Sequence, residues 1–287
     1  MFDISNNFFI NTPNNKSYSD AISVTGSHGV ISDNVMRWTQ APAQPSDGIQ
    51  LVGPCEYVTI DGNTIVGDAS YDNLKVGVYL HESESGAKDV KYVTISNNVI
   101  RGFKYVGEGV GGDCSRGICL TGAPDCVVIG NIIDDYYEAG IRINKSPRAV
   151  VAYNKILNGY AGGYGIWESG DSANSTIVGN DLTECTSTNL IIITSSSVKV
   201  ERNRGFVTEA SGTATVANGD YIAHGLAGTP TTVILTCLNA TYDGVPVVVN
   251  CDYANTNSTH ICVSLYWTNG TAITTPLLVS WYVEYKP

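Results

Sequence analysis

Seven short segments of the sequence, from 21–24 to 189–192, carry side chains that could bind sugars. Each alternates apolar residues with other residue types, as strands with one buried face do. We predict two outward series, the first being Ser23, Gln50, Tyr79, Cys119, Arg142, Trp167 and Ile191, and the second His81, Thr121, Asn144 and Ser169. Aromatic faces stack on the C–H surfaces of sugar rings, while arginine and amide groups bond hydroxyls or carboxylates. The candidate substrate-binding residues are therefore Tyr79, His81, Arg142, Asn144 and Trp167. Alternatively, Arg142 and Trp167 form only a surface cation–π pair.

Glu168 stands where the other segments have an apolar residue, so strict alternation would bury its carboxylate. Buried carboxylates need partners and are common at catalytic sites. The alternative is a local bulge that turns Glu168 toward solvent.

Two carboxylates on neighbouring segments would suit hydrolysis of a glycosidic bond, which needs a spacing of about 5 Å for retention or about 6.5 to 9.5 Å for inversion. The candidate pair is Glu138 and Glu168, with Asp135 and Asp171 as alternates. Further acids that flank the same segments, most of them expected to be merely solvated, are Glu82, Glu84, Glu108, Asp113 and Asp134. A polysaccharide lyase would instead use a base such as Arg142, His81 or Tyr79, often with calcium. Because no aspartate cluster suggests a calcium site, hydrolysis ranks above elimination, and we predict neither a metal nor a cofactor.

The elements that position these residues belong to a repeat marked by asparagine. An apolar residue, two variable residues, Asn, one variable residue and usually another apolar residue recur eight times, at Asn7, Asn34, Asn63, Asn98, Asn131, Asn154, Asn180 and Asn203. A constant motif with variable spacing is typical of a solenoid, whose insertions lie in loops. Single asparagines mark turns in many folds, but eight recurrences in one register favour a repeat.

No repeat can bury its apolar face alone, so the repeats must stack as coils of a parallel β-helix, about 4.8 Å apart. The eight asparagines would then form a ladder at one corner, with each amide bond contributing about 1 kcal/mol. We therefore predict an all-β fold in which about eight coils occupy residues 1–206.

This Asn repeat resembles that of the parallel β-helix proteins of the pectin-lyase-like superfamily, over residues 4 to 206. The resemblance implies a right-handed helix and places ligands along the sheet after the Asn turn, where the two outward series lie. It specifies the fold better than the activity, because lyases, hydrolases, phage tailspikes and adhesins share the scaffold.

Residues 207–287 lack the repeat and show short alternating strands joined by Gly, Asn and Thr turns, which predicts a small antiparallel β-sandwich. The segment 222–231 and the closing residues 281–285 resemble the C-terminal domain of phage tailspikes, which implies trimerisation or glycan binding. For His224, in a Gly-flanked turn, we favour a structural hydrogen-bonding role over a site role.

The amino-acid composition limits the kinds of partner that we expect and indicates the state of the cysteines. The net charge of −11, without a run of Lys or Arg, argues against nucleic acid and anionic membranes, and no segment is apolar for long enough to span a bilayer. Five of the eight cysteines precede residue 206 and three follow it, so we predict mostly buried free thiols. A Cys114–Cys119 or Cys237–Cys262 bridge is the alternative.

These features predict a tailspike-like homotrimer, on a virion tail or cell surface, that recognises a cell-surface polysaccharide. Hydrolysis of this polysaccharide is the enzymatic form of the same prediction. The alternatives are a non-catalytic adhesin or structural fibre module and, ranked lower, a polysaccharide lyase. Six N-x-S/T sequons would fit an exported glycoprotein; they lie at Asn15, Asn144, Asn174, Asn239, Asn257 and Asn269. Because Ile4 and Asn7 are already in register, we expect an upstream segment or a partner to cover the first coil.

Overall fold

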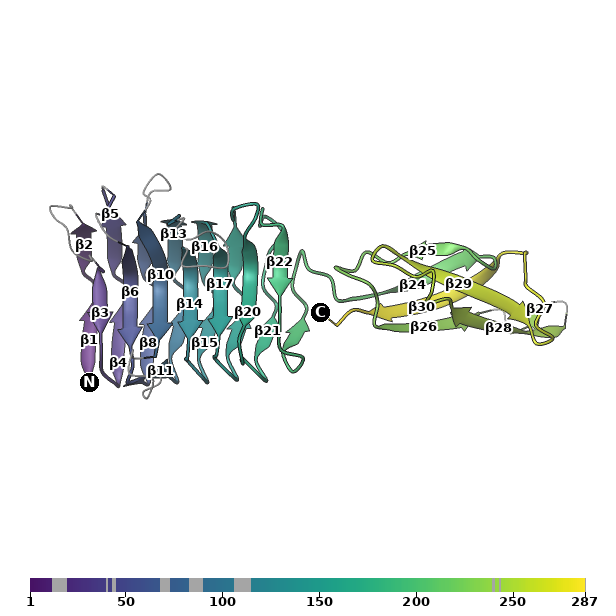
Figure 1. Ribbon diagram of the computed structural model, residues 1–287, viewed down its shortest axis with the longest axis horizontal. Coiled ribbons are helices and arrows are strands. Elements are labelled where there is room, and N and C mark those ends of the chain that lie inside the picture. Colours follow the sequence, from purple (N-terminus) through teal and green to yellow (C-terminus); the bar gives the residue numbers. More distant parts are fainter. Residues whose placement is uncertain are drawn as a thin grey trace. The chain divides into compact units, whose positions relative to one another are not determined.

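The computed structural model describes residues 1–11, 20–39, 41–42, 45–67, 73–82, 90–105, 115–238, 241–242 and 244–286. Within these ranges the chain consists of strands and their connections, without a helix (Figure 1). Accordingly, no helical segment of the described ranges has the length and apolar character needed to cross a membrane. The chain divides into two compact units, Met1–Gly205 and Phe206–Pro287.

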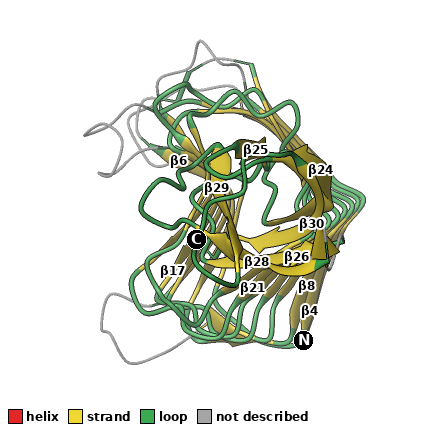
Figure 2. Ribbon diagram, turned by 90° about the vertical axis from the view of Figure 1, so that its right-hand side faces the viewer, coloured by secondary structure: helices red, strands yellow, loops and turns green. Residues whose placement is uncertain are grey.

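The first unit is a solenoid of three parallel sheets, each receiving one strand per coil (Figures 1 and 2). The eight-stranded sheet contains β1 (Phe2–Ser5), β4 (Gly29–Ser32), β8 (Val58–Asp61), β12 (Thr94–Ser96), β15 (Val127–Ile129), β18 (Val150–Ala152), β21 (Thr176–Val178) and β23 (Lys199–Glu201). The seven-stranded sheet contains β3 (Ile22–Val24), β6 (Ser46–Val52), β10 (Leu74–His81), β14 (Arg116–Thr121), β17 (Ala139–Asn144), β20 (Tyr164–Ser169) and β22 (Asn189–Ile192). The six-stranded sheet contains β2 (Phe8–Asn11), β5 (Val35–Trp38), β9 (Thr64–Val66), β13 (Val99–Phe103), β16 (Ile132–Tyr136) and β19 (Lys155–Leu157). The predicted parallel β-helix is confirmed, although only one of its sheets has eight strands.

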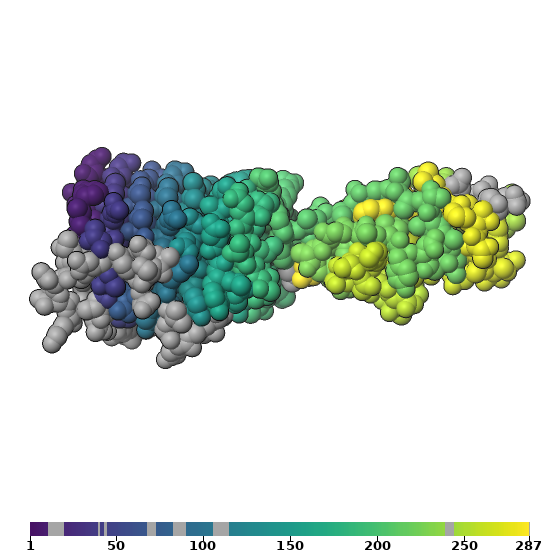
Figure 3. Space-filling view, turned by 90° about the horizontal axis from the view of Figure 1, so that it is seen from above, coloured from purple at the N-terminus to yellow at the C-terminus, as the bar shows by residue number. Residues whose placement is uncertain are grey.

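The coils follow one another in sequence order along this unit (Figure 3). Each coil therefore pairs only with its neighbours, and β7 (Cys55–Glu56) and β11 (Val90–Lys91) add a short two-stranded sheet at one corner. The strands β1, β2 and β3 end the three sheets, and Phe8 and Ile10 are exposed there. That another segment or a partner covers this coil stays a prediction.

An asparagine ladder occupies the corner between the eight-stranded and six-stranded sheets. From Asn7 to Asn180, the backbone N–H and the Nδ2 amide of each asparagine both donate to the Oδ1 of the asparagine in the following coil, at 2.9–3.1 Å. Nδ2 also reaches a carbonyl of the previous coil, as from Asn98 to Ile60 at 3.0 Å. The ladder residues from Asn34 onward are buried, so these bonds replace water that the amides cannot reach.

The tight turn at this corner needs a left-handed residue directly before each asparagine. The φ angles there lie between 52° and 68°, at Asn6, Asp33, Gly62, Asn97, Gly130, Tyr153, Gly179 and Arg202. Asn, Asp and Gly tolerate this conformation best, which explains why they hold six of the eight positions.

Inside the solenoid, apolar side chains stack in register from coil to coil. One such column joins Ile31, Ile60, Ile95, Val128, Val151 and Ile177, all fully buried. The prediction for β22 was wrong by one residue, because Ile191 pairs with Ile166 in the core while Ile192 pairs with Trp167 and is exposed. The strands β6, β10, β14, β17 and β20 each contain a glycine whose added Cβ would meet the core, such as Gly165, whereas β22 has Leu190 opposite that glycine.

The second unit packs two antiparallel sheets on one core. One sheet has the order β24 (Glu209–Val216), β30 (Leu277–Glu284) and β26 (Thr232–Cys237). The other has the order β25 (Tyr221–Ala223), β29 (His260–Trp267), β28 (Val245–Cys251) and β27 (Thr241–Tyr242). Their shared core includes Val216, Ile261, Val263, Leu265 and Val279. This arrangement is the predicted small antiparallel domain.

Four of the seven described cysteines are buried free thiols, as predicted, and the other three are partly exposed. Cys55, Cys119 and Cys126 are free and buried, and Cys262 is also free. Neither bridge weighed from the sequence is therefore formed, and Cys114 itself lies outside the described residues. Burial raises the pKa of the Cys126 thiol to about 12; a backbone hydrogen bond at Val93 opposes this rise and the Asp125 charge adds to it.

We expect Asn98→Ala to destabilise the solenoid by roughly 3 kcal/mol, because it leaves the Asn63 amide donors buried without their acceptor. Asn7→Ala, at the exposed end of the same ladder, should cost less than about 1 kcal/mol. Urea denaturation followed by circular dichroism measures both variants. Equal losses of unfolding free energy would show that burial of the ladder does not set its contribution.

Candidate functional site

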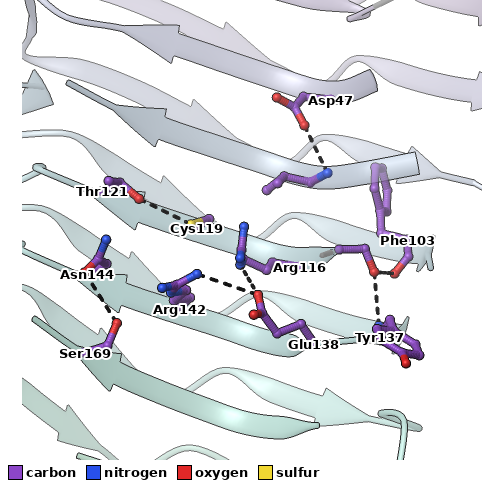
Figure 4. Close-up of polar contacts among 12 residues, drawn as sticks. Asp47, Phe103, Arg116, Cys119, Thr121, Tyr137, Glu138, Arg142, Asn144 and Ser169 are labelled. Atoms are coloured by element: carbon purple, nitrogen blue, oxygen red, sulfur yellow. Dashed lines mark hydrogen bonds and ion pairs between the residues drawn. The ribbon is translucent and has the colours of Figure 1, made fainter. Parts of the chain in front are cut away.

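The outer surface of the seven-stranded sheet carries three columns of side chains across β6, β10, β14, β17 and β20, which we call the polar face (Figure 4). Register places Gln50, Tyr79, Cys119, Arg142 and Trp167 in the middle column. The column further along contains Val52, His81, Thr121, Asn144 and Ser169. The column before contains Asp47, Val76, Arg116, Ala139 and Tyr164. Buried residues on the same strands, such as Ile118 and Ile141, fix this register from the core side.

Sequence reasoning missed the column of Asp47, Arg116 and Tyr164. The signal was present, because each of these residues directly precedes the glycine that recurs in these strands, at Gly48, Gly117 and Gly165. The missed positions are chemically important, since Asp47 and Arg116 are both buried ionisable groups.

Arg142, Trp167 and Tyr164 form a stacked group on β17 and β20. The Arg142 guanidinium carbon lies 4.2 Å from the centroid of the Trp167 ring, and the rings of Trp167 and Tyr164 are 4.7 Å apart. The predicted cation–π pair is therefore confirmed. A pair of this kind orders the arginine while leaving part of its hydrogen-bonding edge for another group.

Glu138 lies between two arginines (Figure 4). Its fully buried carboxylate contacts the Arg116 guanidinium directly and lies 3.8 Å from Nη1 of Arg142. Burial works against the charge of Arg116, but Cys119 and Glu138 outweigh it, and the net effect raises the pKa of the guanidinium. Glu138 is thus an ion-pair partner within the face and not a carboxylate open to solvent.

Tyr79 and His81 stack on each other on β10, with ring centroids 4.6 Å apart. Burial, followed by the neighbouring Cys119, raises the pKa of the Tyr79 phenol to about 12, so this residue is a poor general base near neutral pH. His81 Nδ1 lies 2.9 Å from the Glu82 carbonyl oxygen, and because a carbonyl only accepts, Nδ1 carries the proton. Asn144 lies in the same column as His81 but two strands away, and its Oδ1 accepts a hydrogen bond from the Ser169 hydroxyl on the next strand at 3.4 Å.

Glu168 is buried, as alternation predicted, and the bulge alternative is wrong. It pairs in register with Ile143, and its Oε2 accepts hydrogen bonds from the Thr194 N–H at 2.6 Å, the Ser195 N–H at 3.0 Å and the Thr194 hydroxyl at 3.1 Å. These contacts tie the turn after β22 to β20. Glu168 therefore holds the turn after β22 from inside the solenoid, and its side chain does not lie on the polar face.

The register also separates the two proposed catalytic carboxylates. Glu168 lies opposite Ile143, five residues beyond Glu138, so the two acids are roughly 16 Å apart along the strands at about 3.3 Å per residue. Their interpretation as an opposed pair is wrong, because either glycosidase spacing is much shorter.

The remaining acids do not replace that pair. Asp135 lies on β16 in the six-stranded sheet and contacts Lys104, while Asp171 is exposed beyond the end of β20. Asp134 pairs with Arg101 at 3.4 Å. Glu84, Glu108 and Asp113 lie outside the described residues. Across the described ranges, no group of three or more His, Cys, Asp or Glu side chains is placed to hold a metal ion.

His224 has the structural role favoured from the sequence. Its Nδ1 accepts a hydrogen bond from the Leu226 N–H at 3.0 Å, so its Nε2 donates to the Asn257 carbonyl at 3.1 Å. Both ring nitrogens are used in holding a turn of the second unit.

Three stacked parallel sheets around an apolar core, with an inward asparagine ladder, define the class of parallel β-helix proteins. A family model described as "Right handed beta helix region" matches residues 20–205, and the chain belongs to that family. No curated protein matches the chain.

Several solved structures are similar in fold. The tailspike protein gp49 from Pseudomonas phage LKA1 is 12% identical with a TM-score of 0.41, covering 99% of this chain and 67% of its own. The A-module of the mannuronan C-5 epimerase AlgE4 from Azotobacter vinelandii is 16% identical with a TM-score of 0.45, covering 69% of this chain and 57% of its own. A mutant tailspike protein of E. coli bacteriophage HK620, solved with a hexasaccharide, is 12% identical with a TM-score of 0.38, covering 99% of this chain and 64% of its own. The chain thus spans between about half and two thirds of these proteins.

We expect Glu168→Ala to lower the free energy of unfolding by about 3 kcal/mol, since it leaves the Thr194 and Ser195 amides without their charged acceptor. Hydrogen exchange should show these two amides losing protection, whereas Asp171→Ala, an exposed acid three residues away, should change neither measurement. Unaltered protection of Thr194 and Ser195 in the Glu168→Ala variant would contradict the structural role.

Proposed function

We propose that the protein recognises a cell-surface polysaccharide through the polar face and that it binds this glycan without cleaving it. The observation that carries the proposal is the stacked group of Arg142, Trp167 and Tyr164. The stacked Tyr79–His81 pair lies on the same surface, two coils before Arg142. Aromatic faces that alternate with hydrogen-bonding groups along a rigid sheet match the alternating apolar and hydroxyl surfaces of a sugar chain.

The rigidity of the scaffold supports this role. Neighbouring strands are about 4.8 Å apart, so side chains on successive coils present a regular series of contacts to an extended polymer. Each contact side chain is held by a neighbour before any ligand arrives, as Arg142 is by Trp167, which lowers the entropy lost on binding.

Binding is favoured over hydrolysis because the two carboxylates predicted as the catalytic pair are not opposed across the polar face. Glu138 is enclosed by Arg116 and Arg142, and Glu168 is hydrogen-bonded to the turn after β22. An elimination mechanism gains no support from Tyr79, whose raised pKa disfavours the phenolate that a base requires. The proposal therefore joins the tailspike-like prediction to the non-catalytic alternative.

We further propose that the protein acts outside the cell, on a virion tail or a cell surface, as a homotrimer held in part by the second unit. The outer surface of its three-stranded sheet exposes Ile234, Leu238 and Leu278, which lie near one another across β26 and β30. The positions between them are the uncharged Thr236 and Ser280. An uncharged surface with several exposed aliphatic residues favours association with further copies of the chain.

Trp167→Ala should weaken binding to the recognised polysaccharide at least about tenfold, because aromatic anchors supply much of the contact energy at such surfaces. Affinity electrophoresis against a panel of capsular and cell-wall polysaccharides gives the comparison, beside Tyr153→Ala as an exposed aromatic control at the asparagine corner. The same mixtures should yield no new reducing ends. Failure of every polysaccharide to retard the protein, or equal retardation of both variants, would contradict the proposal.

The combined Ile234→Asp and Leu278→Asp variant should be a monomer where the parent protein is a trimer, since each aspartate would bury a charge in the contact. Light scattering coupled to size exclusion measures the mass. Tyr221→Asp, on the other sheet of the same unit, is the control. A parent protein that is already monomeric would remove this part of the proposal without affecting glycan recognition.

A further inference from the structure

Among the described residues, two buried polar atoms on the polar face have no hydrogen-bond partner, and one is a donor while the other is an acceptor. Nε of Arg142 is a donor without an acceptor, and Nε2 of His81 is without a partner as well. Because His81 Nδ1–H donates to the Glu82 carbonyl, the neutral ring leaves Nε2 as an acceptor. Buried polar groups are rarely left unpaired in proteins, so these atoms indicate that the polar face lacks a partner at two places.

The positions of the two atoms define the size of such a ligand. His81 is on β10 and Arg142 is on β17, with β14 between them, so the two residues are about 9.6 Å apart across the sheet. The residues of β14 in these two columns are the smaller Cys119 and Thr121. A single small anion cannot reach both atoms, whereas a chain of sugar rings passing over β14 can.

Among the described residues, the charge of Arg142 is only partly balanced. Its carboxylate partner is Glu138 at 3.8 Å, and Glu138 is in closer contact with Arg116. The other buried carboxylate of the face, Asp47, lies on β6 and accepts a hydrogen bond from the Val76 N–H at 3.0 Å. The Arg142 side chain remains 17% exposed, so a charged group of a ligand can reach it.

We infer that the polar face selects an acidic glycan, whose anionic substituent is bound by Arg142 while a hydroxyl of the same chain donates to His81 Nε2. This inference rests on the proposed glycan recognition and specifies its ligand class. A carboxylate, sulfate or phosphate group provides the acceptor that Arg142 lacks, and arginine binds all three through paired N–H donors. A neutral sugar offers His81 its donor but leaves the guanidinium unpaired.

Glu138 then acts as a positioning residue. It is fully buried and cannot touch the glycan, but it holds Arg142 from one side while Trp167 holds it from the other. This role has a distinctive consequence. Removing a negative charge beside an anion site strengthens anion binding if the charge acts only by repulsion, whereas loss of a positioning contact weakens it.

The test begins with an array of neutral, carboxylated, sulfated and phosphorylated oligosaccharides, read at two salt concentrations. We expect the retained glycans to be acidic and their binding to fall with salt. For a carboxylated glycan, chemical reduction of its carboxyl groups to alcohols keeps the same backbone and should weaken binding about tenfold or more; for a sulfated or phosphorylated one, desulfation or phosphatase treatment serves the same purpose. Retention of neutral glycans, or binding that survives removal of the charge, overturns the inference but leaves glycan recognition standing. Retention of no glycan at all overturns both.

Single-residue variants then test whether Arg142 causes the preference for acidic glycans. Arg142→Gln should abolish the preference for the charged over the uncharged form of the bound glycan, and Arg142→Lys should keep only part of it, because lysine lacks the paired donors. Arg101 is also ion-paired, to Asp134, but it is exposed and lies on the six-stranded sheet. Arg101→Gln is therefore the matched control and should bind as the parent does. An unchanged preference in Arg142→Gln overturns the assignment.

Glu138→Gln separates positioning from repulsion. We expect it to weaken binding of the acidic glycan and to change the fluorescence of Trp167 in the unliganded protein, as Arg142 leaves the ring. Tighter binding of the acidic glycan in a folded Glu138→Gln variant overturns the positioning role. Should that variant fail to fold, His81→Phe tests the second predicted contact with the glycan. It keeps the aromatic stack with Tyr79 but removes the Nε2 acceptor, so it should weaken binding.

Discussion

The structure depends on one constraint, which is that every coil must repeat the register of the coil before it. The asparagine ladder enforces this constraint, because one Oδ1 accepts both the backbone N–H and the side-chain amide of the preceding asparagine, as Asn98 does for Asn63. A shift of one residue in any coil would leave these buried donors unpaired and would also turn its apolar residues away from the core. Register is therefore fixed at the corner and transmitted along each strand.

This constraint shapes the polar face. Because register is fixed, side chains at equivalent positions stack within about 4.8 Å of one another, and each must be compatible with its neighbours on both sides. Unlike groups can share a column, as Arg142 and Trp167 do, whereas like charges need a partner between them, as Arg116 and Arg142 have in Glu138. The same stacking makes the face rigid, which suits recognition of a repeating polymer better than chemistry that requires two acids to meet.

The two glutamates illustrate how position in the solenoid decides the role of one residue type. Glu138 stands just before its strand, where two guanidinium groups surround it, and Glu168 stands inside the solenoid one coil later, where the next coil ends in a turn. In the middle of the solenoid the inward position of Glu168 is filled by Ile143 and Leu120, because a neighbouring coil covers it with apolar side chains. Near the last coil the carboxylate instead provides acceptors for turn amides that have no further strand to pair with.

The sequence by itself determined the parallel β-helix, the ladder positions and the outward columns up to Trp167, because all of these follow from local periodicity and from eight recurrences of one motif. For Glu168 it offered both burial and a bulge, and the structure decided for burial. Sequence reasoning misplaced Ile191 and Ile192, since β22 lacks the glycine that β6, β10, β14, β17 and β20 share. Only the tertiary structure decided which acids meet. Proximity across coils depends on the offset of each residue along its strand, so Glu138 finds Arg116 and Arg142, while Glu168, five positions further along, finds the turn at Thr194 and Ser195.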